Sequence, residues 1–92
     1  MNRLTETHRM DWNCMMLEIT YEPDWMPSGI ADDPLAHITV HSIYPETDAP
    51  LPIAPSGWYA RAFRASTVAS AGGPVNFIDV MLEAEGGAHV PS

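Results

Sequence analysis

Hydrophobic and polar residues alternate with a period of two in three stretches of the chain. From Asn13 to Glu22 one face is apolar, and it carries Met15, Leu17, Ile19 and Tyr21. Leu35 to Tyr44 alternates in the same way and is rich in β-branched residues, and Trp58 to Ala65 alternates aromatic with small or basic residues. Alternation of this kind is typical of strands with one buried face. We therefore predict three strands, over residues 13–22, 35–44 and 58–65.

A helical period replaces the alternation near the end of the chain. Between Pro74 and Glu85 the apolar residues follow the spacing i, i+3, i+4, i+7. Pro74 suits the first turn because its φ is already close to the helical value, and Gly86-Gly87 is a typical helix stop. This pattern predicts a helix from Pro74 to Glu85, preceded by a short turn that Ser66 caps and that ends near Ala71.

Two proline-rich segments separate the predicted strands. Residues 23–34 contain three prolines and three aspartates and carry Trp25 and Met26. We predict a long loop there, and loops of this length are usually functional or mobile. Four prolines between Pro45 and Gly57 cannot donate to a β-ladder, so this segment is expected to be an extended crossing or a sheet edge.

These elements predict an α+β fold in which a small antiparallel three-stranded sheet is packed by one C-terminal helix. Laying the helix on the sheet buries both apolar faces. A chain of 92 residues is of single-domain size. We expect residues 1–12 to be a flexible N-terminus, residues 13–87 to form the domain and residues 88–92 to be a tail.

Charge is the least ordinary feature of the composition. Twelve carboxylates face four arginines and no lysine, which gives a formal net charge of −8. No basic residue other than histidine lies between Arg9 and Arg61. A surface of one sign repels nucleic acid and attracts basic molecules. Direct binding to nucleic acid is therefore not expected, and the expected partner is a host protein with a basic surface.

The remaining composition restricts the compartment and the chemistry. The single cysteine, Cys14, cannot form an intrachain disulfide or anchor the usual thiolate zinc site. The N-terminal residues contain no apolar stretch of the length that a signal peptide or a membrane span requires. We expect a cytoplasmic protein without membrane contact, either a monomer or a small homo-oligomer.

Several short motifs follow one another between Leu51 and Glu85. They are Leu51-Pro52, Ser56-Gly57 with Phe63, Ala71-Gly72-Gly73-Pro74-Val75, Phe77, and Leu82 ahead of Glu83. This segment resembles a group of small uncharacterised proteobacterial plasmid and phage proteins whose pattern is Leu-Pro, Thr-Gly-Tyr-Arg-Ser-His-Phe, Ala-Gly-Gly-Pro-Val, an aromatic, and Trp-Leu-Asp-Glu-Ala. The chain departs from that pattern at residues 58–62, which lack the Ser-His pair, and at Met81, where the group has Trp. The resemblance implies a helix that starts at Gly-Gly-Pro and carries no activity with it.

Two histidines four residues apart, His37 and His41, suggest a phosphate or zinc site. Residues 37–40 match one copy of the His-x-Thr-x element of two-histidine phosphoesterases, but those enzymes need two copies. On a strand the spacing separates the two side chains by about 13 Å, which one ion cannot bridge. We predict no catalytic residue, no metal site and no cofactor.

Aromatic and acidic residues in the proline-rich segments indicate a different kind of site. Three Trp exceed what one small core requires, and exposed Trp and Met beside such loops are common at protein interfaces. The predicted partner-binding residues are Asp24, Trp25, Met26, Asp32, Asp33, Glu46, Asp48 and Trp58.

The leading hypothesis is a non-enzymatic, acidic protein-interaction module. In its specific form it is an inhibitor encoded by a mobile element, which like an anti-CRISPR protein blocks a basic nucleic-acid-binding surface of a host protein complex. One alternative is a small-ligand or metal-binding subunit that uses the strand histidines. Another is an obligate homo-oligomer in which short strands pair edge to edge.

Overall fold

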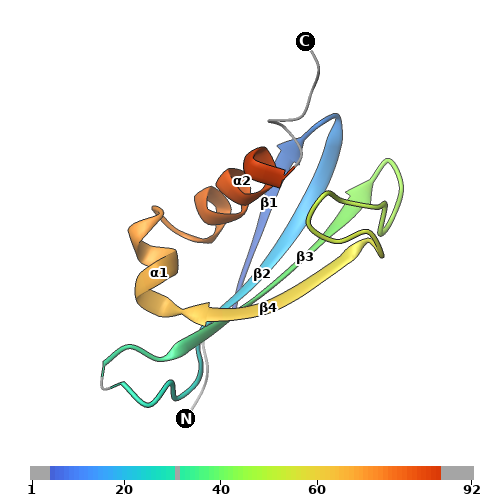
Figure 1. The fold of residues 1–92 in the computed structure, drawn as a ribbon. Coiled ribbons are helices and arrows are strands. Elements are labelled where there is room, and N and C mark those ends of the chain that lie inside the picture. The colour runs from blue at the N-terminus through green and yellow to red at the C-terminus, as the bar shows by residue number, and fades with distance from the viewer. Residues whose placement is uncertain (1–4, 31, 86–92) are drawn as a thin grey trace.

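The computed structural model describes residues 5–30 and 32–85, which form four strands and two helices (Figure 1). The strands are β1 (Glu6–Trp12), β2 (Met15–Met26), β3 (Leu35–Tyr44) and β4 (Trp58–Arg64), and the helices are α1 (Ala65–Ser70) and α2 (Pro74–Glu85). Neither helix in this part of the chain is long and apolar enough to cross a membrane. The helix stop expected at Gly86-Gly87 and the tail expected at 88–92 lie outside the described residues.

The four strands form one antiparallel sheet in the order β1-β2-β3-β4. Both helices lie on the same side of this sheet (Figure 1). Helix α2 packs against β1 and β2, whereas the shorter α1 packs against β3 and β4. One face of the sheet is therefore covered, and no element of the described chain covers the other.

The core lies between the sheet and the helices. Alternate residues of β2, β3 and β4 point into it, together with parts of both helices and of the segment before β4. Its buried members are Leu17, Ile19, Tyr21, Ala36, Ile38, Val40, Leu51, Ala54, Tyr59, Val68, Ile78 and Leu82. The predicted bounds of the second strand and of the long helix are confirmed, because the period-two and period-3.6 patterns each matched one buried face.

The prediction of a three-stranded sheet with one helix is wrong, because the sheet has a fourth strand and α1 is a second helix. The extra strand, β1, comes from residues for which the sequence predicted no structure. Its ladder pairs Met10 with Leu17 and Trp12 with Met15. Met10 and Trp12 also pack against the core, so β1 is held by its neighbour β2 and by apolar contacts at only two of its positions.

The first predicted strand also has different ends. Asn13 and Cys14 have φ of 50° and 63° and form the tight turn between β1 and β2, a conformation that hairpin turns favour. At its other end β2 continues to Met26, whereas the sequence predicts a loop that begins at Pro23. The register shifts between Glu22 and Met26, and an irregular ladder of this kind accommodates a proline that cannot donate a hydrogen bond.

Helix α1 lies where a turn capped by Ser66 was predicted, but Ser66 is not its cap. The helix begins after Arg64, whose own side chain makes no capping hydrogen bond. The backbone N–H and the hydroxyl of Ser66 instead donate to the two carboxylate oxygens of Asp33, at 2.9 and 2.8 Å. These bonds connect the loop between β2 and β3 to the start of α1.

This connection predicts a pH dependence of stability. The hydrogen bonds from Ser66 hold the pKa of the Asp33 carboxyl below its ordinary value, and Arg64 adds a smaller effect in the same direction. A lowered pKa in the folded state stabilises the protein above the pKa of the unfolded chain, about 3.9, and the effect is lost as pH falls through the folded value. We expect Asp33→Asn to lower the free energy of unfolding at neutral pH and to flatten its decline below about pH 4. Urea unfolding across pH measures both effects.

The neighbouring Asp32→Asn is the matched control, and it should leave the dependence of the free energy of unfolding on pH unchanged. Equal curves for the two variants would refute the role assigned to the hydrogen bonds between Asp33 and Ser66.

Candidate functional site: the open face of the sheet

The face of the sheet opposite the helices, called here the open face, carries polar and aromatic side chains. Cross-strand pairing sets them in rows, because Arg9 lies opposite Glu18, Glu18 opposite His41, and His41 opposite Trp58. The open face comprises Arg9, Glu18, Thr20, Glu22, His37, Thr39, His41, Trp58, Ala60 and Ala62, with Trp25 and Asp48 at its margins. Residues distant in sequence thus form one continuous surface.

His41 is the most connected residue of the open face. Its Nδ1 lies 3.0 Å from a carboxylate oxygen of Asp48, and its Nε2 lies 3.3 Å from one of Glu18. The ring stacks on the indole of Trp58 with 4.5 Å between ring centroids. Glu18 is also 3.6 Å from the guanidinium of Arg9. The imidazole is held on both edges and on one side of its ring.

This geometry restricts the chemistry that His41 can perform. Because carboxylates only accept hydrogen bonds, both contacts are hydrogen bonds only when both ring nitrogens carry protons. A general base or a metal ligand needs a ring nitrogen that is free to face substrate or ion. Both nitrogens of His41 face carboxylates, and no cluster of three or more potential ligands that could hold a metal ion is found within residues 5–30 and 32–85.

His37 repeats part of this arrangement toward the other end of the sheet. Its ring stacks on Trp25 with 4.6 Å between centroids, and its Nδ1 lies 3.8 Å from a carboxylate oxygen of Glu22. That separation is an ion-pair distance and too long for a hydrogen bond. Each histidine therefore lies between an indole and at least one carboxylate.

Small side chains occupy the sheet between the two histidine–tryptophan pairs. Thr20 pairs with Thr39, and Thr39 pairs with Ala60. Ala60 and the nearby Ala62 are exposed. Because these side chains are short, the surface is lower between the two indoles than at the indoles themselves. Another protein surface can pack against this shallow depression.

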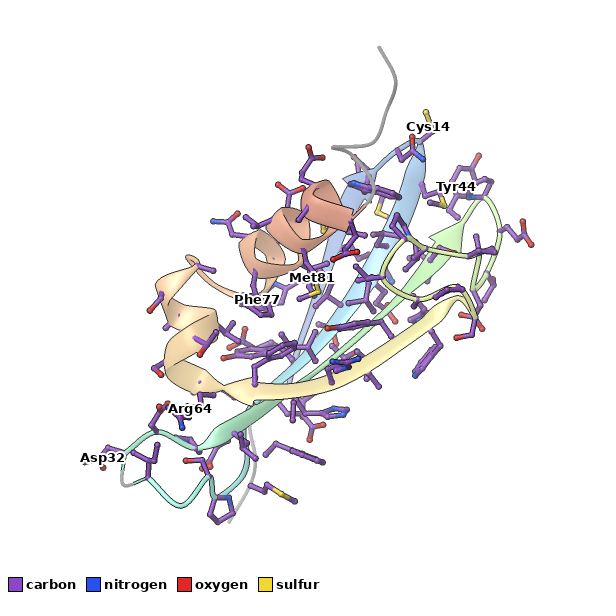
Figure 2. All side chains as sticks on the ribbon, viewed as in Figure 1. Cys14, Asp32, Tyr44, Arg64, Phe77 and Met81 are labelled. Atoms are coloured by element: carbon purple, nitrogen blue, oxygen red, sulfur yellow. The ribbon has the colours of Figure 1, made fainter. Side chains whose placement is uncertain are left out.

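The predicted partner-binding residues fall at the two ends of the sheet. Asp24, Trp25, Met26, Asp32 and Asp33 lie at the end where β3 begins, and Glu46, Asp48 and Trp58 lie at the end where it finishes. Figure 2 shows the two ends, with Asp32 and Arg64 at one and Cys14 and Tyr44 at the other. The carboxylate of Asp33 accepts hydrogen bonds from Ser66. The side chain of Met26 is 43% exposed. Trp25 on β2 and Trp58 on β4 lie at the open face, and Asp48 reaches it from the loop after β3 through its contact with His41.

Ser42 positions Asp48 although it is not itself on the open face. Its buried hydroxyl donates to the backbone oxygen of Glu46 at 2.6 Å and accepts from the N–H of Ala49 at 2.7 Å. The N–H of Asp48 donates to the backbone oxygen of Ser42 at 3.0 Å. These three bonds fix the loop after β3, so the carboxylate of Asp48 is presented to His41.

Sequence reasoning did not select Glu18, Glu22 or Ser42 as functional residues. The alternation in residues 15–22 already placed Glu18 and Glu22 on the polar face of a strand, and the alternation in residues 35–44 placed His37 and His41 together. Only the pairing of β2 with β3 brings these faces side by side. The signal for Ser42 was a hydroxyl at an inward position of an otherwise apolar strand.

Comparison with known proteins identifies the family of the chain. No curated protein and no solved structure matches it significantly. The family model described as the KlcB third domain matches residues 5–91. Because this match spans nearly the whole sequence, the chain belongs to the KlcB third-domain family.

Proposed function

We propose that this domain is a non-enzymatic protein-interaction module whose open face binds a basic surface of a host protein. The open face is the observation that carries the proposal. It combines the carboxylates of Glu18, Glu22 and Asp48 with two indoles on a sheet face that no described element covers. KlcB is a plasmid-associated family name, which is consistent with a protein encoded by a mobile element.

The charge and the aromatic groups favour the same kind of partner. Carboxylates that surround an indole attract lysine and arginine side chains, and a guanidinium can also stack on the indole. Trp58 is 49% exposed, so part of its ring is free for such a contact. The net charge of −8 speeds the approach of a basic surface, and the carboxylates of the open face disfavour an acidic partner at that face.

Two double variants with equal changes of charge test the proposal. Glu22→Arg with Asp48→Arg reverses two charges of the open face, and Asp79→Arg with Glu83→Arg reverses two exposed charges of α2 on the opposite side. Tagged wild-type and variant proteins are used for affinity capture from nuclease-treated lysate of the plasmid host, with quantitative mass spectrometry. The affinity of each recovered protein is then measured with purified components.

We expect a basic protein that is retained by the wild type and the α2 variant and lost by the open-face variant, with its affinity reduced about tenfold or more. Trp58→Ala should weaken the same complex by a comparable factor, since exposed Trp residues often dominate interface energies. Equal loss in both double variants would show that only overall charge matters, and recovery of the same proteins by all variants would contradict the proposal.

The narrower hypothesis of an anti-CRISPR-like inhibitor makes an additional demand. The captured partner must be a nucleic-acid-binding complex, and the domain must compete with nucleic acid for it. A binding assay with labelled nucleic acid tests this directly: wild-type domain should displace the nucleic acid, and the open-face variant should not. A partner whose nucleic-acid binding is unaffected would reject inhibition of this kind while leaving the interaction itself intact.

A further inference from the structure

Strand β4 is a free edge of the sheet that residues 5–30 and 32–85 form. It is last in the order β1-β2-β3-β4, and Figure 1 shows no strand or helix beyond it. An edge strand directs the N–H and C=O groups of alternate residues away from the sheet, where another extended chain can pair with them. β4 contains no proline, so every outward residue of the strand has a backbone N–H.

Two hydrogen bonds identify which residues point outward. The N–H of Trp58 donates to the side chain of Ser56 at 3.4 Å, so it is not directed to β3. The N–H of Ala65, just after the strand, donates to the backbone oxygen of Pro34 on the β3 side at 2.8 Å. Because direction alternates along a strand, the even-numbered residues Ala60 and Ala62 direct their N–H and C=O groups to the free edge.

The charge of β4 is opposite to that of the protein as a whole. Among the residues that the structure describes, two of the three arginines, Arg61 and Arg64, lie on this strand. Both are exposed, and neither guanidinium is within ion-pair distance of a carboxylate of that part of the chain. An added strand with acidic side chains would therefore meet cationic groups that have no ion-pair partner.

A cleft lies beside the same edge on the helix side of the sheet. Its volume is about 270 Å³, and it is lined by Pro52, Ile53, Tyr59, Arg61, Met81 and Glu85. It lies between β4 and α2, which packs mainly against β1 and β2 and contacts β4 through Phe77 and Phe63, whose ring centroids are 4.7 Å apart. Pro52, Ile53 and Met81 supply apolar surface there beside the polar groups of Arg61 and Glu85, so an apolar side chain entering beside Tyr59 would lose part of its contact with water.

We propose that β4 binds an extended acidic segment of a partner protein as a fifth, antiparallel strand, with an apolar side chain of that segment in the cleft. The outward groups of Ala60 and Ala62 supply the backbone hydrogen bonds, and their small side chains permit close approach. Arg61 and Arg64 select acidic residues. A second copy of the chain fits less well, because full-length antiparallel pairing of β4 with itself sets Arg61 opposite Arg61.

A peptide as long as β4, acetyl-Asp-Val-Thr-Glu-Thr-Leu-Thr-amide, tests the proposal. In antiparallel pairing its Glu lies opposite Arg61, its two inner Thr residues opposite Ala62 and Ala60, and its Leu opposite Tyr59 beside the cleft. Amide NMR titration and hydrogen exchange on the wild-type protein measure binding. We expect millimolar or tighter binding, with new protection of the Ala60 and Ala62 amides.

Two modified peptides separate strand addition from charge attraction. N-methylation of the two inner Thr residues removes the donors that face β4, and it should weaken binding about tenfold. Replacing Asp and Glu by Lys should abolish it. On the protein side Ala62→Pro removes one outward donor while the β3–β4 bonds remain, and Ala62→Thr keeps that donor as a control.

The outcomes are distinct. Absence of binding at millimolar peptide, or equal binding of the N-methylated peptide, would overturn the proposal even if Ala62→Pro failed to fold. A dimer of the free protein in sedimentation, with Ala60 and Ala62 already protected, would overturn it in favour of self-pairing. The Glu22→Arg, Asp48→Arg variant should bind the acidic peptide at least as tightly as wild type, so the edge and the open face are tested independently.

Discussion

Replacement of Leu82 by alanine is expected to lower the free energy of unfolding by about 2–5 kcal/mol. Leu82 is completely buried in the cluster between α2 and the sheet. Truncation removes the transfer energy of its side chain and leaves a cavity that the rigid sheet cannot close. Domains of this size have only about 5–15 kcal/mol of stability in total, so the variant should unfold at clearly lower urea concentration. Urea titration followed by circular dichroism measures the change.

Val80 provides the matched control in the same helix. Its side chain is 64% exposed, so Val80→Ala changes the stability by no more than about 0.5 kcal/mol, as is usual for surface substitutions. A loss at Leu82 no larger than that at Val80 would show that α2 is not packed on the sheet as described. Equal slopes of the urea curves would confirm that both variants unfold from the same compact state.

The elements that the sequence predicted well are those with one strongly apolar face. In β3, Ala36, Ile38 and Val40 are fully buried and alternate with polar residues. In α2, Ile78 and Leu82 are buried one turn apart. In both cases the pattern of the element itself reports its burial, so bounds and faces could be inferred without knowing any partner.

Strand β1 could not be inferred in this way. Its residues include Glu6, His8 and Arg9, and only two of its positions, Met10 and Trp12, pack against the core. It forms because β2 is long enough to present a full ladder of donors and acceptors to it. A strand that depends on its neighbour more than on its own apolar face leaves little signal in the sequence. The Asn13-Cys14 turn was also missed, because hairpin turns usually have glycine at the second of these positions.

The same distinction applies to the open face. Acidic and aromatic residues could be chosen from the sequence as candidate partner-binding residues, and Trp25, Asp48 and Trp58 were among those chosen. Their relation to the two histidines depends on register, since His41 meets Glu18 only because β2 and β3 pair at that position. Register is set by the whole sheet, and a shift of one residue would place these side chains in the core.

Gly57→Ala is expected to destabilise the protein by about 1–3 kcal/mol or more and to displace Asp48 from His41. Gly57 has a φ of +89°, and a Cβ at this position would clash with the backbone oxygen of Asp48. Backbone atoms cannot rotate away as a side chain can, so the loop itself must move. Asp48 is held there by the Ser42 bonds, and moving the loop breaks them. Urea unfolding measures the first effect, and NMR shifts of the His41 ring measure the second.

Gly29→Ala separates backbone strain from the steric clash. Gly29 has nearly the same φ, +91°, but nothing lies within 4 Å of a Cβ placed there. Its replacement should therefore cost only the strain of a left-handed alanine, about 1 kcal/mol, and leave the His41 ring unchanged. The difference between the two variants isolates the close approach of Gly57 to Asp48. Equal losses of stability in the two variants, with no change at the His41 ring, would show that the loop does not position Asp48. His41 would then be held by its contact with Glu18 alone.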